Sequence, residues 1–186
     1  MRVFYKLPIA YFILFLSSVA LHAQSKYDKR YSKAEALYEL GDYKGAESAL
    51  EKFYSKVSKK LGKENKYTTT YKLAKAKYAL ANGLLLDFES GVTEVVNQSL
   101  LVNTWSSQAH GELLFTIADL HIQNGSHKVA LEFLDQSHKI LKSGNFLDEH
   151  WQSKLDLSNA EALTGQGFFT QAIDLLYGRQ KYFAGR

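Results

Sequence analysis

The histidines are the residues of this chain best suited to chemistry, and they cluster: His110, His121, His127, His138 and His150. A histidine-rich zinc site needs a spacing such as His-Glu-x-x-His, which puts both rings and a carboxylate on one helical face. No such spacing occurs in the chain. His121 and His127 also fall where other parts of the sequence carry aliphatic or aromatic residues. We therefore expect packing roles for both and no metal site.

Other catalytic signatures are missing from the sequence. The chain has no cysteine, which excludes disulfides, thiolate ligands, cysteine nucleophiles and a lipid-bearing N-terminal cysteine. Gly165 and Gly167 lack the preceding strand and third glycine of a phosphate-binding loop, and no Gly-x-Ser-x-Gly motif occurs. The sequence predicts a protein that is not an enzyme and binds no cofactor.

The N-terminus has the pattern of an export signal. Arg2 and Lys6 precede 17 uncharged residues, 7–23, and small residues follow where a signal peptidase cuts. We expect a signal peptide over 1–23, cleaved after Ala23, and a periplasmic or extracellular protein. The alternative is an uncleaved membrane anchor, although this stretch falls short of the ~20 residues that span a bilayer.

Charge is distributed unevenly over a chain of 186 residues. Residues 24–77 hold 14 Lys and Arg against 7 Asp and Glu, whereas residues 78–186 hold 7 against 12. Lys52, Lys56 and Lys60 share one helical face. This face is either simply exposed to solvent or contacts an anionic envelope surface. The export signal argues against nucleic acid as a partner.

A spaced pattern of small residues organises the rest of the chain. Taking Ala46, Gly91, Ala130 and Ala172 as reference positions gives spacings of 45, 39 and 42. An alanine stands twelve residues before each reference position, and an aliphatic residue four after it. A glycine stands five before three of them, with Leu86 as the exception. Small residues let helices cross closely, so each unit reads as a helical hairpin.

Pro8 is the only proline, so the remaining chain can form helices throughout. We expect an all-α fold with N-caps at Ser126 and at Asn103 or Thr104. The predicted helices span residues 25–40, 43–61, 66–84, 88–102, 104–124, 127–142, 148–164 and 168–183.

The first unit, from Ala34 through Leu37, Tyr38, Gly41 and Tyr43 to Ala46 and Leu50, resembles the tetratricopeptide repeat (TPR). The third and fourth units are similar, whereas Leu86 and Gly91 depart from the pattern in the second. The linker over 60–65 resembles that of the longer variety of this repeat, known from kinesin light chain and bacterial arrays. The resemblance implies a right-handed α-α superhelix, a TPR-like solenoid of about four helical hairpins over 24–186. Its units are expected near 26–62, 66–103, 104–143 and 147–183.

In the resembled family, the first helices of successive units line a groove that binds peptides. The corresponding positions here are aromatic and acidic, which favours a ligand carrying Lys or Arg: Tyr31, Glu35, Tyr38, Phe115, Asp119, Ile122 and Glu161. The resemblance therefore implies an exported, non-catalytic scaffold for protein–protein interaction. The alternative is a sensory or regulatory N-terminal segment of a longer enzyme, such as a CHAT-type protease, a histidine kinase or a cyclase.

The last predicted helix is too apolar for one buried stripe: Phe169, Ile173, Leu175, Leu176, Tyr177, Tyr182 and Phe183. An uncovered face of this kind requires a partner. We expect either that the protein continues past Arg186 with another repeat, or that the C-terminal unit self-associates.

Overall fold

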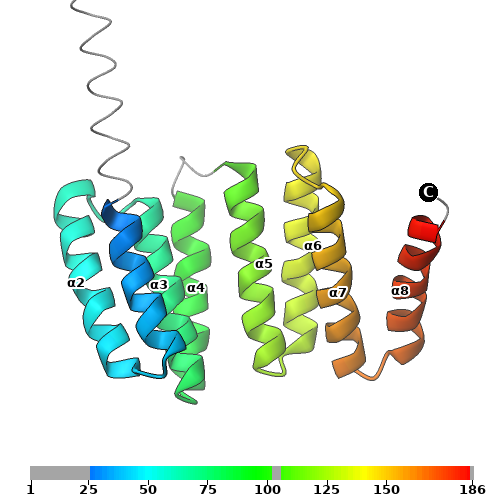
Figure 1. Ribbon diagram of the computed structural model, residues 1–186, viewed down its shortest axis with the longest axis horizontal. Helices are drawn as coiled ribbons and strands as arrows, with labels where there is room; N and C mark the ends of the chain where they lie inside the picture. The colour runs from blue at the N-terminus through cyan, green and yellow to red at the C-terminus, as the bar shows by residue number, and fades with distance from the viewer. Residues whose placement is uncertain (1–25, 102–105, 185–186) are drawn as a thin grey trace, which may run out of the picture.

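The computed structural model describes residues 26–101 and 106–184, and within these ranges the chain forms helices and turns. The predicted signal peptide over 1–23 lies outside the described residues. Eight helices follow one another as antiparallel neighbours in a row (Figure 1). They are the N-terminal helix (residues 26–39), α2 (Tyr43–Leu61), α3 (Lys66–Ala81), α4 (Leu85–Leu101), α5 (Ser107–Gln123), α6 (His127–Ser143), α7 (Glu149–Gly165) and α8 (Phe169–Ala184).

The turn inside each hairpin is built on a glycine with positive φ. Gly41, Gly83, Gly125 and Gly167 have φ between 71° and 82°, and they are equally spaced along the chain. Only glycine adopts this conformation without a steric cost, so these glycines mark where each hairpin turns along the sequence. An alanine seven positions before each of these glycines is buried every time: Ala34, Ala76, Ala118 and Ala160.

The second unit is therefore as regular as the others, and the register predicted for it is wrong by three residues. The second helices of the first three units bury residues at the same spacing of four, three and four: Ala46, Leu50, Phe53, Val57; Phe88, Val92, Val95, Ser99; and Ala130, Leu134, Ser137, Leu141. The equivalent of Ala46 is thus Phe88, and not Gly91, and the turn glycine is Gly83, so Leu86 is no exception.

Phe88 fits at this alanine position because its ring packs toward the next unit. Its centroid lies 5.2 Å from that of His121 on α5. Gly91 lies against α3 instead, where an added Cβ would come 3.0 Å from the Cβ of Ala76. The small residue of α4, Gly91, therefore does not mark the position that is equivalent to Ala46.

Most helix bounds agree with the predictions within two or three residues, and the caps explain several of them. Asp42, Asn65, Ser106 and Asp148 each accept a hydrogen bond from a backbone N–H in the first turn of the following helix. Ser106 caps α5 in place of Asn103 or Thr104, which lie outside the described residues. Ser126 precedes α6 as predicted, but its side chain makes no capping hydrogen bond.

The core consists of three consecutive apolar clusters. The first joins the N-terminal helix, α2 and α3, the second joins α3, α4 and α5, and the third joins α5, α6 and α7. The clusters overlap along the row, so each hairpin is stabilised mainly by its neighbours, as in repeat proteins. The backbones of α2 and α3, and of α6 and α7, approach closely, whereas α4 and α5 are joined mainly through side chains.

None of the described helices combines the length and apolar character that a transmembrane span requires.

Candidate functional site

The corrected register changes which residues share a position on the first helices of the four units. Three rows follow: Tyr31, Leu73, Phe115, Leu157; Glu35, Lys77, Asp119, Glu161; and Tyr38, Leu80, Ile122, Thr164. The predicted acidic row thus contains a lysine in the second unit. Its two consecutive acidic positions lie in the third and fourth units.

In the first unit, the predicted ligand-binding tyrosines are used to join helices. Burial and a hydrogen bond to Glu35 raise the pKa of Tyr31 above its ordinary value. The ring of Tyr38 stacks on Tyr78 of α3 at 4.7 Å, and the Lys77 amine lies 4.7 Å from the Tyr38 centroid. Tyr31 also packs on Phe53 of α2, so the rings of Tyr31 and Tyr38 already contact neighbouring helices.

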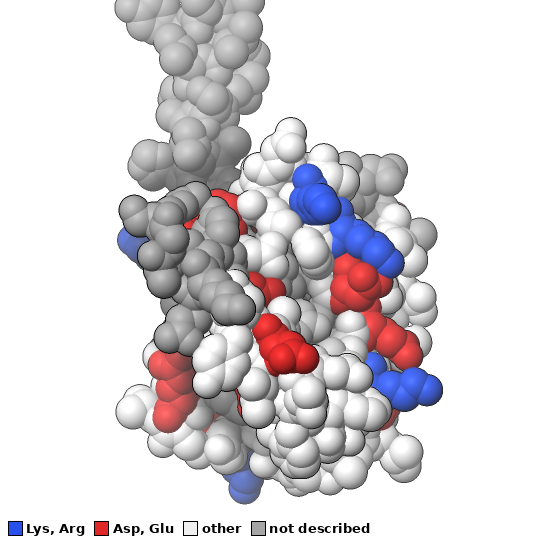
Figure 2. Space-filling view, turned by 90° about the vertical axis from the view of Figure 1, so that its right-hand side faces the viewer, with Lys and Arg blue, Asp and Glu red and all other residues white. Residues whose placement is uncertain are grey.

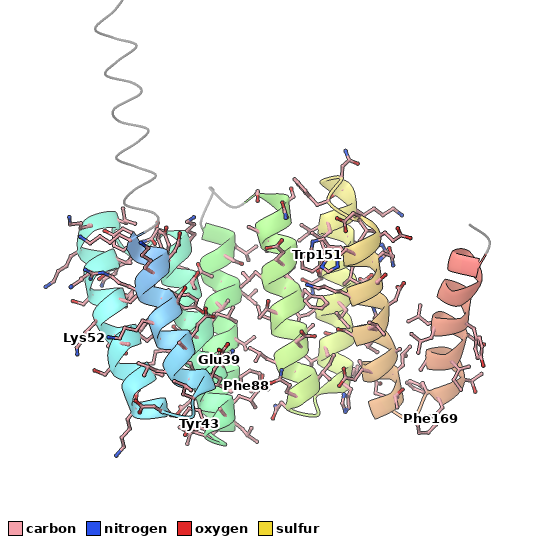
Figure 3. All side chains as sticks on the ribbon, in the orientation of Figure 1. Glu39, Tyr43, Lys52, Phe88, Trp151 and Phe169 are labelled. Atoms are coloured by element: carbon pink, nitrogen blue, oxygen red, sulfur yellow. The ribbon has the colours of Figure 1, made fainter. Side chains whose placement is uncertain are left out.

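The third and fourth units bring three predicted residues into a second group, which we call the α5–α7 site: Phe115, Asp119, Trp151, Ser158 and Glu161. Phe115 meets Trp151 of α7 edge to face at 5.5 Å (Figure 3). The Ser158 hydroxyl donates to the Asp119 carboxylate at 3.2 Å. Sequence reasoning missed Trp151 and Ser158, because they became relevant only once α7 was placed against α5.

The electrostatics of the α5–α7 site centre on Asp119. Burial raises the pKa of its carboxyl group, and the nearby charge of Glu161 raises it further. The Ser158 hydrogen bond and the charge of Lys154 act in the opposite direction. Asp119 is thus a partly desolvated carboxylate beside a second, exposed carboxylate and a pair of aromatic rings.

Ile122 does not belong to this surface, contrary to the prediction. It is buried in the third apolar cluster. The reason is the position of α5, which packs against both α6 and α7, so that the last turn of α5 is enclosed.

His121 and His127 pack against neighbouring helices, as predicted. His121 is buried and its ring stacks on Phe133 at 5.5 Å. His127 lies against Gly165, where an added Cβ would collide with the imidazole ring. Among the described residues, no group of three or more His, Cys, Asp or Glu is arranged to hold a metal ion.

A concave feature, which sequence reasoning did not identify, lies over α3 between α2 and α4. This tyrosine groove has a volume of about 880 Å³. Tyr43, Tyr54, Tyr71 and Tyr78 line it, and small residues such as Ala76 line the α3 side. The many tyrosines in the first half of the chain were the feature of the sequence that could have indicated this groove.

Polar contacts within the tyrosine groove connect its helices. Tyr54 stacks on Tyr71 at 4.1 Å, and the Tyr71 hydroxyl donates to Glu51 at 2.7 Å. Lys75 also pairs with Glu51, at 3.3 Å, and Lys72 pairs with Glu94 of α4 at 3.4 Å. These groups hold α2 and α4 to α3, and the charged residues that line the groove include both lysines and carboxylates.

Comparisons with protein-family models, curated proteins and solved structures found no match to this chain.

Proposed function

We propose that the protein is an exported, non-catalytic scaffold, a TPR-like right-handed superhelix that binds a Lys- or Arg-bearing segment of another protein at the α5–α7 site. The observation that carries the proposal is the environment of Asp119. Its carboxylate is half-buried beside Glu161, and the Phe115–Trp151 ring pair adjoins it on the same two helices.

A cation supplied by a ligand would improve this environment. Burial and the neighbouring Glu161 both disfavour the charged form of Asp119. A Lys or Arg side chain placed between the two carboxylates offsets both effects, and its alkyl stem packs on aromatic rings. The rings then supply much of the affinity, because fully desolvated aromatic contacts dominate binding energy.

The corrected repeat register favours this end of the molecule for the cation. In the second unit, Lys77 occupies the position of Asp119 and Glu161 and lies over Tyr38. A basic ligand residue is repelled there. At the α5–α7 site Lys154 lies over Trp151, but the carboxylates of Asp119 and Glu161 outnumber this one cation and attract a basic ligand residue. We expect affinity in the micromolar range, about −8 kcal/mol.

The test begins with peptides selected from a displayed random library against the full chain. Titration calorimetry then compares the wild type with Asp119→Asn and Phe115→Ala. Matched controls are Glu132→Gln, an exposed carboxylate on α6, and Leu86→Ala, an exposed side chain on α4. Circular dichroism checks that each variant folds.

We expect the selected peptides to be rich in Lys and Arg. The two site variants should weaken binding at least about tenfold, or ~1.4 kcal/mol, and the controls should not. Binding should also weaken as the pH falls through the raised pKa of Asp119, because the cation requires the ionised carboxylate. Selected peptides without basic residues, or binding insensitive to both site variants, would contradict the proposal. Loss of binding in Tyr54→Ala instead would place the ligand in the tyrosine groove.

A further inference from the structure

The first hairpin, made of the N-terminal helix and α2, separates its charges onto two sides. Three of its acidic residues, Asp28, Glu35 and Glu51, face α3. Asp28, together with burial, raises the pKa of Tyr67 to about 12, and Glu35 contributes to a similar rise for Tyr78. On α2, Glu51 bonds to Tyr71 and pairs with Lys75. These three carboxylates are therefore turned toward the second unit.

The basic residues of the hairpin occupy the flanks that turn away from α3. With about 3.6 residues per turn, the basic residues of the N-terminal helix lie opposite Asp28 and Glu35, and those of α2 lie opposite Glu51. Figure 3 shows Lys52 projecting from the outer side of α2. We call this surface the basic face: Lys26, Lys29, Arg30, Lys33, Lys52, Lys56, Lys59 and Lys60.

Sequence analysis singled out only three members of the basic face, on α2. In the fold, the N-terminal helix contributes the other basic residues of this face, because the first half of that helix runs beside the second half of α2. Two ring contacts fix this placement: Tyr31 lies 5.7 Å from Phe53, and Tyr27 lies 5.3 Å from Tyr67 at the start of α3. The chain thus gathers eight cations at the outer end of the row of helices.

No carboxylate of the described residues forms an ion pair with the basic face. Four ion pairs form among the described side chains, and none uses a residue of this face. The flanks continue through Ala36, Ser48 and Ala49, and they carry no Asp or Glu. Clustered like charges create a strong positive potential that attracts an extended anion.

The shape and composition of the basic face indicate which kind of anion it binds. It is the outside of two packed helices, and seven of its eight residues are lysines, which act as point charges and do not form planar forks. The aromatic rings near it face inward. Tyr27 is buried, Tyr31 packs on Phe53, and Tyr54 packs on Tyr71. Without exposed rings, it lacks the stacking platform of single-stranded nucleic-acid sites. We propose that the basic face docks the protein on an anionic lipid bilayer.

This docking leaves the α5–α7 site accessible, because α2 lies at one end of the row of helices and α5 and α7 lie farther along it (Figure 1). Each lysine held near an anionic membrane strengthens partitioning about fivefold. Salt weakens the attraction, because the Debye length falls from ~10 Å at 0.1 M to ~3 Å at 1 M.

The experiment measures co-sedimentation of the full chain with lipid vesicles. Vesicles of phosphatidylcholine alone are compared with vesicles containing phosphatidylglycerol, at low and high salt. The face variant replaces Lys29, Lys33, Lys52 and Lys56 by Gln. The matched control removes the same charge elsewhere, from Lys44, Lys128, Lys139 and Lys142. Both variants keep the same N-terminal residues as the wild type.

We expect the wild type to bind the anionic vesicles, and this binding to weaken at high salt. The face variant should bind them about two to three orders of magnitude more weakly, and the control should lose much less affinity. Peptide binding at the α5–α7 site should survive in both variants, which separates this inference from the proposed function. Equal binding to neutral vesicles, or equal loss in both variants, would overturn the proposal. Tighter binding of a short DNA duplex than of anionic vesicles would overturn it as well.

Discussion

Gly111 lies at a close approach of α5 to α6. A Cβ added there would come 2.5 Å from Cγ of Leu141, and the Ser137 hydroxyl donates to the Gly111 carbonyl at 2.8 Å. Leu141 is fully buried, so it has little room to move. Glycine at this position is therefore a packing requirement.

We expect Gly111→Ala to destabilise the protein by about 1–2 kcal/mol, because overpacking outweighs the gain in helix propensity of at most ~1 kcal/mol. Gly178→Ala is the matched control, since nothing lies within 4 Å of its added Cβ. The control should gain about 0.5–1 kcal/mol. Urea unfolding followed by circular dichroism measures both. A stabilised Gly111→Ala would show that α5 and α6 do not cross there.

His121 is a buried titratable group between α4, α5 and α6. Phe88 and Phe133 contact its ring, and the Glu89 carboxylate lies 3.9 Å from Nδ1. Burial lowers the pKa of His121, although Glu89 acts against this shift. The unfolded chain, with an ordinary histidine pKa of ~6.5, therefore binds the proton more readily than the folded one.

We expect His121 to make the protein less stable as the pH falls below about 6.5, and to have no effect on the pH dependence above it. His121→Leu, which introduces the residue found at the equivalent positions 37 and 163, should reduce this loss on acidification. Some loss should remain, because burial also lowers the pKa of His110. The free energy of unfolding measured from pH 7 to pH 5 gives the comparison. An equal loss in wild type and variant would exclude His121 as its source.

Among the elements, α8 is the helix with the largest uncovered apolar surface. Ala172 is buried against its neighbour, but Phe169, Ile173 and Tyr177 are 61%, 52% and 60% exposed. Figure 2 looks onto this end and shows that uncharged residues form much of the surface. The exposure expected for Phe169, Ile173, Leu176 and Tyr177 is thus confirmed, whereas the side chains of Tyr182 and Phe183 lie outside the described residues.

We expect the α8 face to bind a hydrophobic dye and to associate reversibly with a second copy, because contiguous exposed apolar surface favours association. The double variant Phe169→Ser, Ile173→Ser should reduce both effects, and the exposed but distant Leu86→Ser should not. Light scattering coupled to gel filtration, with dye fluorescence, provides the measurement. A monomer that binds no dye would mean that the face is covered.

At the scale of helices, the sequence predicted most bounds because glycines and capping residues mark them. Gly41, Gly125 and Gly167 follow the first helix of their hairpins with positive φ, as expected. The second unit was misplaced because Phe88 stands where the other units have alanine. Its ring is accommodated by contacts with α5, and no local pattern in the sequence could show that contact.

At the scale of the whole molecule, part of the candidate site was predictable from the repeat. Phe115, Asp119 and Glu161 lie together because they face the same side of adjacent units. Trp151 and Ser158 were missed, since they join the site only through the packing of α7 on α5. Ile122 was predicted wrongly because periodicity within one helix does not show how many neighbours enclose it.

The equal spacing of the turn glycines and the buried alanines also makes the units interchangeable modules. The turn glycines and buried alanines repeat at identical offsets, so the gain or loss of one whole unit preserves the spacing of turns and of buried small residues. A change of another length inside a helix rotates the residues that follow it in that helix out of phase with their neighbours. Arrays built on this plan can therefore lengthen or shorten by whole units during evolution while the surfaces of the remaining units are retained.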